Sequence, residues 1–238
     1  MIKTIIFFAF YFPFTGFCAT LVILTSLVGT ADRVHSIATF WGRTAFRVAG
    51  GRVETEGEEN IPPDRPVIFI SNHQSNFDIP TLYAGLPVQF RWLAKQELFD
   101  IPVFGLAMKR SGYIPVDRSD NRKSMISMKH AADRIRQGTT VGVFPEGTRS
   151  PDGKLLPFKK GGFMLALKSG VPVVPVAIIG SRDLCPKGSL RIRGGTIRVR
   201  FFEPIETADL TNRDRDDLID RVFQTIAGAV EEGRRDDA

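Results

Sequence analysis

The pattern of apolar and polar positions along this chain predicts strands that alternate with helices. Short apolar runs of strand length lie at residues 66–71, 88–93, 112–116, 140–144 and 172–179, with another between 191 and 202. Helical spacing of apolar residues marks 98–109, 123–137 and 163–168, and a last helix that begins near Thr211. This alternation predicts an α/β fold with a mostly parallel, mixed sheet flanked by helices.

The N-terminus is apolar over a length that suits a membrane. Residues 4–31 include no charged residue and no histidine, and six of them are phenylalanine. A helix of about 20 apolar residues crosses a bilayer core, so this run is long enough to span it. Pro13 and Gly16 offer an alternative, because a break there would give an interfacial hairpin. A buried core helix is a further alternative. A cleaved signal peptide is disfavoured, since only Lys3 precedes the run and Phe17-Cys18-Ala19 is a poor cleavage site.

The segment that follows predicts a basic amphipathic helix. Apolar residues recur at helical spacing at Val34, Ile37, Ala38, Trp41, Ala45 and Val48. Arg33, Arg43 and Arg47 lie off that stripe, as expected at a lipid headgroup boundary. The alternative is a surface helix on the catalytic domain. We expect residues 1–50 to form a membrane-anchoring helical segment and 51–238 the catalytic domain. The arginines after the apolar run predict that this domain lies on the cytoplasmic side of the cell membrane.

The overall charge favours an anionic partner. The formal net charge is +6, which suits nucleic acid, an anionic membrane surface or a phosphorylated substrate. Nucleic acid is disfavoured, because the positive charge is dispersed and the N-terminus is apolar. Cys18 and Cys185 are the two cysteines and lie far apart, so we expect no disulfide and no cysteine metal site.

Candidate acid–base chemistry lies in the polar loop 71–78, directly after the first apolar run. This loop carries His73 and Asp78 at a position where α/β folds place active sites. Residues five apart on a helix point roughly 140° apart, so the two side chains can meet only if the chain between them turns. An imidazole held by a carboxylate is a general base near neutral pH. No protein nucleophile is evident beside it, so the base is expected to act on a hydroxyl of the substrate.

A second polar loop, 144–150, follows the apolar run at 140–143. Gly147 permits a close backbone approach, and Thr148 and Arg149 can bind an oxyanion. Glu146 would either orient Arg149 or bond a substrate hydroxyl. The alternative is an ordinary tight turn with a surface arginine.

Two further cations follow strands and are candidate phosphate ligands. Arg118 ends the third apolar run, and a guanidinium fits phosphate bidentately. Its alternative is a surface ion pair with Asp117 or Asp120. Lys95 is a second candidate.

The apolar run at 171–176 contains two prolines, Pro172 and Pro175. Proline removes a ladder donor, so the run is predicted to be an edge or bulged strand. It would either line a groove for an acyl chain or belong to the core.

Four segments in order, with the chemistry just described, resemble the glycerolipid acyltransferase family and, within it, the 1-acylglycerol-3-phosphate (lysophosphatidic acid) acyltransferases. These segments are 72–78, 112–118, 144–150 and 171–175, flanked by similar stretches at 59–62 and 94–98. The resemblance covers roughly residues 50–205. The second segment often carries an aromatic residue where this chain has Pro115.

The resemblance implies direct acyl transfer from a thioester to a lysophospholipid, giving phosphatidic acid at the membrane. His73 would take the proton of the acceptor hydroxyl, and Asp78 would fix the imidazole tautomer and stabilise the cation. Residues 51–238 would be the acyltransferase domain. The residues implied to hold the glycerol phosphate are Arg118, Glu146, Gly147, Thr148, Arg149 and, as a further candidate, Lys95. The donor would be acyl-coenzyme A or acyl carrier protein, with no cofactor and no metal.

Other functions remain open on the residues alone. The acceptor could be glycerol 3-phosphate or a lyso-aminolipid such as lyso-ornithine lipid. A membrane-anchored lipid hydrolase is a different class, although the chain has no Gly-x-Ser-x-Gly elbow. A lipid-binding module without catalysis would have no need of both His73 and Asp78.

Overall fold

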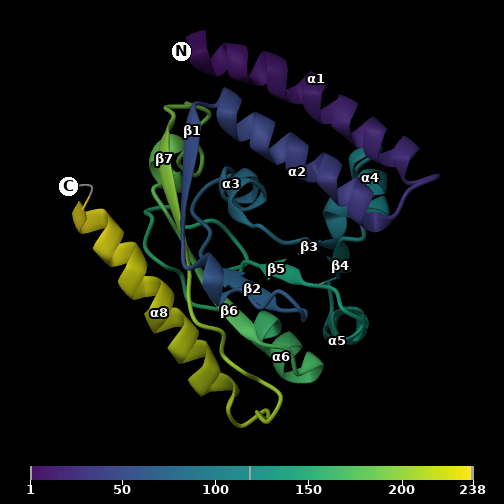
Figure 1. Cartoon of the computed structure of the whole chain (residues 1–238), viewed down its shortest axis with the longest axis vertical. Helices are drawn as coiled ribbons and strands as arrows, with labels where there is room; N and C mark the ends of the chain where they lie inside the picture. The colour runs from purple at the N-terminus through teal and green to yellow at the C-terminus, as the bar shows by residue number, and fades with distance from the viewer. Residues whose placement is uncertain (1, 118, 237–238) are drawn as a thin grey trace.

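The computed structural model describes residues 2–117 and 119–236 and has an α/β fold in which helices cover both faces of a mixed sheet (Figure 1). The strands are β1 (Gly51–Glu56), β2 (Ile68–Ser71), β3 (Arg91–Lys95), β4 (Ile114–Val116), β5 (Val141–Val143), β6 (Val173–Ile179) and β7 (Gly195–Phe201). The α-helices are α1 (Ile2–Thr25), α2 (Ala31–Val48), α3 (Asp78–Gly85), α4 (Phe104–Arg110), α5 (Asn121–Arg136), α6 (Lys160–Ser169), α7 (Ser181–Leu184) and α8 (Arg215–Asp236). Two 3-10 helices, η1 (Glu58–Asn60) and η2 (Gln96–Asp100), complete the described elements.

The described sheet has the strand order β1-β7-β6-β2-β5-β3-β4. All neighbouring pairs are parallel except β6 and β7, which are antiparallel. The predicted α/β fold with a mostly parallel, mixed sheet is therefore confirmed. Each apolar run predicted to be a strand is a strand, with ends that differ by a few residues.

The sequence pattern does not predict strand β1, because the charged residues between 51 and 59 indicate a boundary between segments. Arg52, Glu54 and Glu56 are exposed, whereas Val53 and Thr55 between them are half-buried. This alternation is that of an edge strand with one face turned to solvent. The strand exists because β7, far away in the sequence, pairs with it in parallel over its whole length.

The proline-containing strand β6 lies inside the sheet, so the prediction of an edge strand is wrong. It pairs with β2 on one side and β7 on the other, and every residue in it is buried. Between the pairs Val173–Ile205 and Val176–Phe201, β6 advances by three residues and its partner by four. This one-residue bulge lies opposite Pro175, where a missing N–H donor is tolerated. Of the alternatives that the sequence left open for this strand, a bulge and a position in the core agree with the structure.

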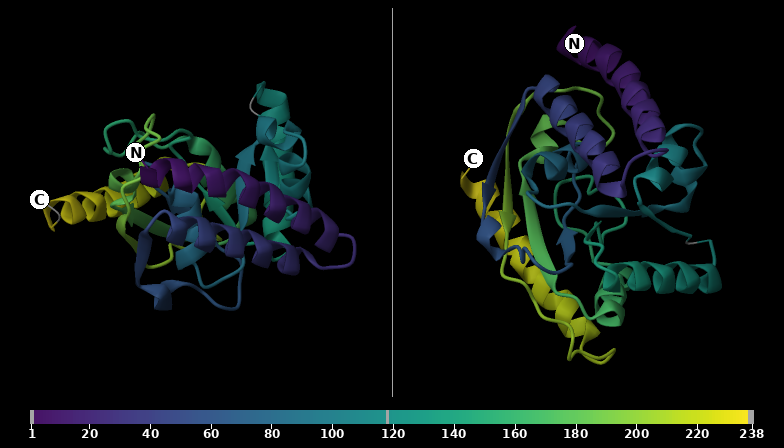
Figure 2. Two further views of the ribbon diagram at one scale, coloured as in Figure 1. Left: turned by 90° about the horizontal axis from the view of Figure 1, so that it is seen from above. Right: turned by 45° about the vertical axis from the view of Figure 1, so that its right-hand side comes forward.

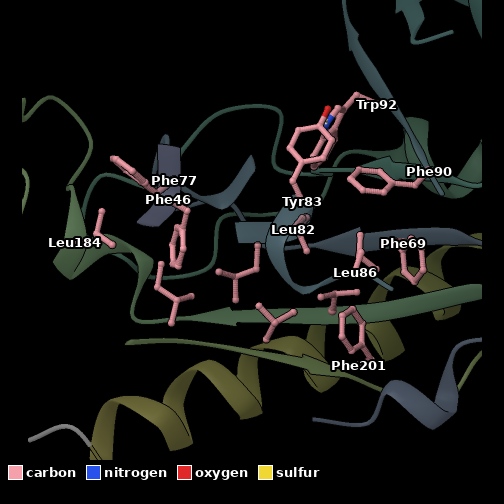
Figure 3. Packing of buried hydrophobic residues seen from close by; sticks show 14 of the residues in the cluster. Phe46, Phe69, Phe77, Leu82, Tyr83, Leu86, Phe90, Trp92, Leu184 and Phe201 are labelled. Atoms are coloured by element: carbon pink, nitrogen blue, oxygen red, sulfur yellow. Dashed lines mark hydrogen bonds between the residues drawn. The ribbon is translucent and has the colours of Figure 1, made fainter. Parts of the chain in front are cut away.

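The sheet separates two buried clusters of apolar side chains. Along β2, Phe69 points to the cluster covered by α2 and α3, whereas Ile68 and Ile70 point to the cluster covered by α5, α6 and α8. Figure 3 shows the first cluster, in which aromatic rings such as Tyr83, Trp92 and Phe90 pack beside one another. Strands buried on both faces explain the continuous apolar runs in the sequence.

Helix α1 lies along the molecule beside α2 (Figures 1 and 2). It continues through Pro13 and Gly16, so the alternative of a break there does not occur. Near its start the Ile192 N–H donates to Thr4 Oγ1 at 3.1 Å, and further along Trp41 Nε1 of α2 donates to Thr15 Oγ1 at 2.9 Å. Among the residues that the structure describes, α1 is the one helix long and apolar enough to cross a membrane.

Helix α2 packs on the rest of the protein, the alternative that the sequence left open. Its Phe46 and the C-cap residue Ala49 belong to the same buried cluster as Phe69 of β2. Asp32 also forms an ion pair of 2.8 Å with buried Arg91 of β3. The arginines of α2 at 33, 43 and 47 are exposed, as predicted.

Two predicted helices have different bounds. The run at 98–109 is divided into η2 and α4 by residues 101–103. The last helix begins at Arg215, because Thr211 and Asp214 form a turn in which the Thr211 N–H and hydroxyl donate to Asp214 Oδ2. Leu218, Val222 and Ile226 are buried in it, as its periodicity predicted.

The contact between α2 and α3 gives a stability prediction at Gly42. A Cβ added there would lie 2.6 Å from Tyr83 Cβ, so Gly42→Ala would push α2 away from α3. We expect the free energy of unfolding to fall by about 1–3 kcal/mol, although alanine favours a helix over glycine by roughly 1 kcal/mol. Urea unfolding in detergent measures it. The matched control is Gly228→Ala in α8, where an added Cβ meets nothing within 4 Å and no loss is expected. Equal effects at both positions would contradict the described packing.

Candidate active site

The loop after β2 is held against the sheet by Asn72. Its side-chain amide donates to the Ile178 carbonyl oxygen and its oxygen accepts from the Ile178 N–H, both at 2.8 Å. Asn72 is fully buried, so both bonds are shielded from water. Ser75 fixes the other end of the loop, because its hydroxyl donates to the Cys185 carbonyl oxygen at 2.7 Å.

His73 and Asp78 meet across this loop, as the sequence predicted for a turn. His73 Nδ1 lies 2.7 Å from Asp78 Oδ2. The same oxygen accepts the N–H groups of Gln74 at 2.7 Å and Ser75 at 2.8 Å. An ionised carboxylate only accepts hydrogen bonds, so Nδ1 carries the proton and Nε2 is free to accept one. The Asp78 side chain is 0% exposed and that of His73 is 16% exposed, so only the base reaches the surface of the site.

Aromatic stacking fixes the plane of the imidazole. The ring of His73 lies 4.1 Å from that of Phe144, with an interplanar angle of 11°. Trp92 stacks on Phe144 in turn, with ring centroids 5.2 Å apart. The stack and the Asp78 bond together leave the imidazole one orientation. No local pattern predicts the role of either aromatic residue, although Phe144 is the first residue of the second polar loop.

Glu146 supports the base from the neighbouring strand. Strands β2 and β5 are parallel neighbours, so the loops that follow them meet at one edge of the sheet. Glu146 Oε1 accepts the His73 N–H at 2.6 Å, and Oε2 accepts the Leu156 N–H at 2.9 Å. The residue is 2% exposed. Its carboxylate therefore positions His73 and does not bind Arg149, contrary to the orienting role considered from the sequence.

Burial sets the protonation of Glu146. It raises the pKa of this carboxyl group to about 7, against the two backbone N–H bonds that lower it. The Glu146 carboxyl group therefore gains or loses its charge near pH 7, next to His73.

The remaining sequence-predicted residues lie around the same loops. Gly147 has a φ of 70° and lines the cavity described below, Thr148 is exposed, and Arg149 is half-buried. Lys95 ends β3 and lines the same cavity. Arg118 lies outside the described residues.

A further cation, Lys187, lies beside the second loop and is not among the residues predicted from the sequence. Its Nζ donates to the Arg149 carbonyl oxygen at 2.6 Å and lies 3.4 Å from Thr148 Oγ1. Within the described chain it makes no ion pair with a carboxylate. Nothing in its local sequence marks it, because its position depends on the contact between two distant loops.

A cavity of about 670 Å³ opens beside His73. Its polar lining residues include His73, Asn76 and Lys95. Most of the lining is apolar and comes from α1, α2, α3, β3 and α4, including Phe8, Tyr11, Trp41, Tyr83 and Met108. A mostly apolar cavity with a histidine and a lysine in its lining suits an amphiphilic substrate.

No side chain described at this site has the setting of an activated nucleophile. Ser75 is fully buried, and its hydroxyl is bonded to the Cys185 carbonyl oxygen. Burial raises the pKa of the Cys185 thiol, the opposite of what a thiolate nucleophile needs. The geometry therefore suits a base that deprotonates a substrate hydroxyl. Among the described residues, no three His, Cys, Asp or Glu side chains could hold a metal ion together.

The chain is similar to known acyltransferases over most of its length. Residues 52–179 match the sequence model of the family named Acyltransferase. A chloroplast 1-acyl-sn-glycerol-3-phosphate acyltransferase, BAT2 of Brassica napus, is 40% identical over 72% of this chain and 50% of its own length. A 1-acyl-sn-glycerol-3-phosphate acyltransferase of Chlamydomonas reinhardtii is 33% identical over 96% of this chain and 70% of its own. The chain thus spans half the length of the Brassica relative.

A solved structure has the same fold. The crystal structure of the 1-acyl-sn-glycerophosphate acyltransferase PlsC from Thermotoga maritima superposes with a TM-score of 0.80 at 32% identity. The match covers 97% of this chain and 94% of that one, so it includes the N-terminal helices as well as the sheet.

The raised pKa of Glu146 predicts a pH dependence of stability. Its pKa is about 7 in the folded protein against 4.5 as the ordinary value, so the folded state binds this proton more tightly. The contribution of Glu146 to stability should therefore fall as pH rises from about 4.5 to about 7, by about 3 kcal/mol in all, and then stay level. Glu146→Gln removes this contribution, so the stability difference between the two proteins should change over this pH range. Urea unfolding of both proteins between pH 4.5 and 8 gives the difference. A difference that does not change with pH would refute the buried, proton-binding carboxyl group.

Proposed function

The chain belongs to the acyltransferase family, and from this premise we propose that it is a 1-acylglycerol-3-phosphate O-acyltransferase. It transfers a fatty acyl group from an acyl thioester to the sn-2 hydroxyl of 1-acylglycerol 3-phosphate, and the product is phosphatidic acid for phospholipid biosynthesis. The observation that carries this proposal is the His73–Asp78 pair, 2.7 Å apart, whose imidazole lines a mostly apolar cavity.

The proposed chemistry needs one base and no covalent intermediate on the protein. His73 Nε2 takes the proton of the acceptor hydroxyl as its oxygen attacks the thioester carbonyl carbon. Asp78 stabilises the imidazolium that forms. The new ester bond replaces the carbon–sulfur bond, and the thiolate leaves and takes the proton from His73. Backbone N–H groups or a nearby donor are needed to stabilise the oxyanion.

The cations around the second loop are proposed to bind the phosphate of the acceptor. Arg149 offers two parallel donors to a phosphate, and Lys95 and Lys187 offer point charges. Thr148 adds a hydroxyl, and Gly147 lets the loop approach closely. Arg118, proposed on the sequence resemblance, would join this set.

The membrane location follows from α1 in this proposal. Helix α1 is held to the domain at Thr4, at Thr15 and near Val22. A helix attached along its length to a polar domain cannot cross the bilayer without drawing that domain in, so we propose that it lies in one leaflet. The domain would then face the cytoplasm, where acyl-coenzyme A or acyl carrier protein supplies the acyl group and no further cofactor is needed.

Acyl transfer by the purified protein tests the proposal. Labelled acyl-coenzyme A and acyl carrier protein donors are offered with lysophosphatidic acid, glycerol 3-phosphate and lyso-ornithine lipid as separate acceptors. We expect phosphatidic acid from the first acceptor. In His73→Ala the rate of acyl transfer should be about 10²–10⁴-fold lower. His130→Ala on α5, which changes a histidine outside the cavity lining, is the matched control. Product from the phosphate-free acceptor alone would reassign the substrate, and full activity of a folded His73→Ala would refute the mechanism.

Lys187 provides a separate test of phosphate recognition. Lys187→Met keeps the length of the side chain and removes its charge. We expect KM for lysophosphatidic acid to rise about tenfold with little change in kcat, since one charge-assisted bond is lost. The KM for a monoacylglycerol, which lacks the phosphate, should not change. Lys129→Met, which changes an exposed lysine of α5, is the control. A parallel loss on both acceptors would show that Lys187 only supports the loop.

A further inference from the structure

The segment from η2 to α4 exposes apolar side chains at a density that protein packing does not explain. Five large apolar residues within nine positions are exposed: Leu98 by 39%, Ile101 by 46%, Val103 by 51%, Phe104 by 37% and Leu106 by 43%. Apolar residues scattered singly on a surface are ordinary, whereas a contiguous group marks an interaction site. We refer to these five residues as the apolar tip.

The backbone of the apolar tip is strained. Val103 has φ 63° and ψ −57°, and within the described chain it is the one residue other than glycine with a positive φ. The Phe104 N–H donates to the Pro102 carbonyl oxygen at 2.6 Å, which closes a three-residue γ-turn around Val103. This turn is unfavourable for a β-branched residue. It also leaves Val103 half exposed, so no burial within the protein offsets the strain.

The other side of the segment is firmly packed. Phe99 is 3% exposed, and a Cβ at Gly105 would lie 2.2 Å from the Phe99 carbonyl oxygen, so η2 and α4 are in close contact. Ala107 packs in a buried cluster with Ala19 and Val22 of α1. The tip is therefore presented by a rigid support and is not a frayed loop.

The apolar tip adjoins α1. Helix α4 lies beside the later half of α1 (Figure 1). Along α1, the exposed residues include Phe17 at 61% and Leu24 at 57%. Leu98 and Phe104 of the tip also line the cavity that reaches His73, together with residues of α1. The two elements thus border one cavity, and each exposes apolar side chains.

We propose that the apolar tip is a second bilayer-inserting element that enters the same leaflet as α1. The inference rests on the proposed membrane location of α1. A lipid bilayer is favoured over a protein partner because α4 packs directly on α1, the described helix that is long and apolar enough for a membrane. The charges of the segment, Glu97 and Asp100 against Lys109 and Arg110, cancel, so the contact is apolar and does not require anionic lipid.

Insertion of the tip would serve the reaction. Residues of both α1 and the tip line the cavity. With both elements in the leaflet, the apolar walls of the cavity meet lipid directly. A lysolipid acyl chain can then pass from the bilayer towards His73 without exposure to water.

Site-specific fluorescence tests insertion of the tip. An environment-sensitive fluorophore is placed at Ile101→Cys in the full chain with Cys18→Ala and Cys185→Ala, and phosphatidylcholine vesicles carrying a quencher in the acyl chains are added. Labels at Phe17→Cys on α1 and Gln224→Cys on α8, on the far face of the sheet, serve as references. We expect a blue shift and quenching at 101 and 17, and neither at 224.

Each other outcome overturns a different step. Insertion at position 17 with position 101 behaving like 224 would refute insertion of the tip and leave the proposed location of α1 intact. No insertion at any position would refute the membrane location itself. A blue shift at 101 that depends on protein concentration without vesicles would identify a second copy of the chain as the partner instead.

A pair of matched variants tests the functional role. Ile101→Asn with Leu106→Gln removes two exposed apolar side chains that do not line the cavity. We expect vesicle binding to weaken about tenfold, with a similar loss of acyl transfer to vesicle-borne lysolipid and unchanged transfer to a detergent-dispersed acceptor. Met125→Gln with Ile126→Asn on α5 removes two side chains exposed by 65% and 61%, and little effect is expected. Equal effects of the two pairs would contradict a specific role of the tip.

Discussion

The described site depends on one buried carboxylate oxygen, Asp78 Oδ2, which accepts three N–H groups from a single turn of chain. A buried charge without partners costs several kcal/mol, whereas a hydrogen bond to a charged group contributes about 1.5–3 kcal/mol. The loop must therefore keep the shape in which the donors of Gln74, Ser75 and His73 all reach this oxygen. That shape directs Nε2 of the imidazole outwards.

The rest of the site is built around this loop by the topology of the sheet. Because β2, β5 and β3 are parallel neighbours, His73, the Glu146 loop and Lys95 emerge at one edge. Glu146 holds the backbone of His73, and Asn72 ties the loop to β6. The base is thus fixed from three strands, which is the preorganisation that general-base catalysis requires.

The helices that precede the sheet supply the apolar half of the site. Helix α2 packs on α3, and α1 packs on α2, so the cavity beside His73 is closed by residues of the first 50 positions. In the proposed function, anchoring and catalysis share these helices: α1 lines the cavity at residues such as Phe7 and Tyr11 and exposes apolar residues such as Phe17 and Leu24. This arrangement suits a reaction whose acceptor and product are both lipids.

Local patterns in the sequence determined most of the elements and singled out the pair His73 and Asp78, which the structure brings together. Strand length and helical period act over a few residues, and the His73–Asp78 spacing becomes meaningful as soon as the chain between them must turn. Tertiary structure alone decided the features that join distant segments. Strand β1 exists through β7, Pro175 is tolerated through a bulge opposite it, and Lys187 reaches the Arg149 loop from another part of the chain. The same reason explains the contact between Glu146 and His73. Their two loops meet because β2 and β5 are neighbours in the sheet, and no local pattern in the sequence predicts that order of strands.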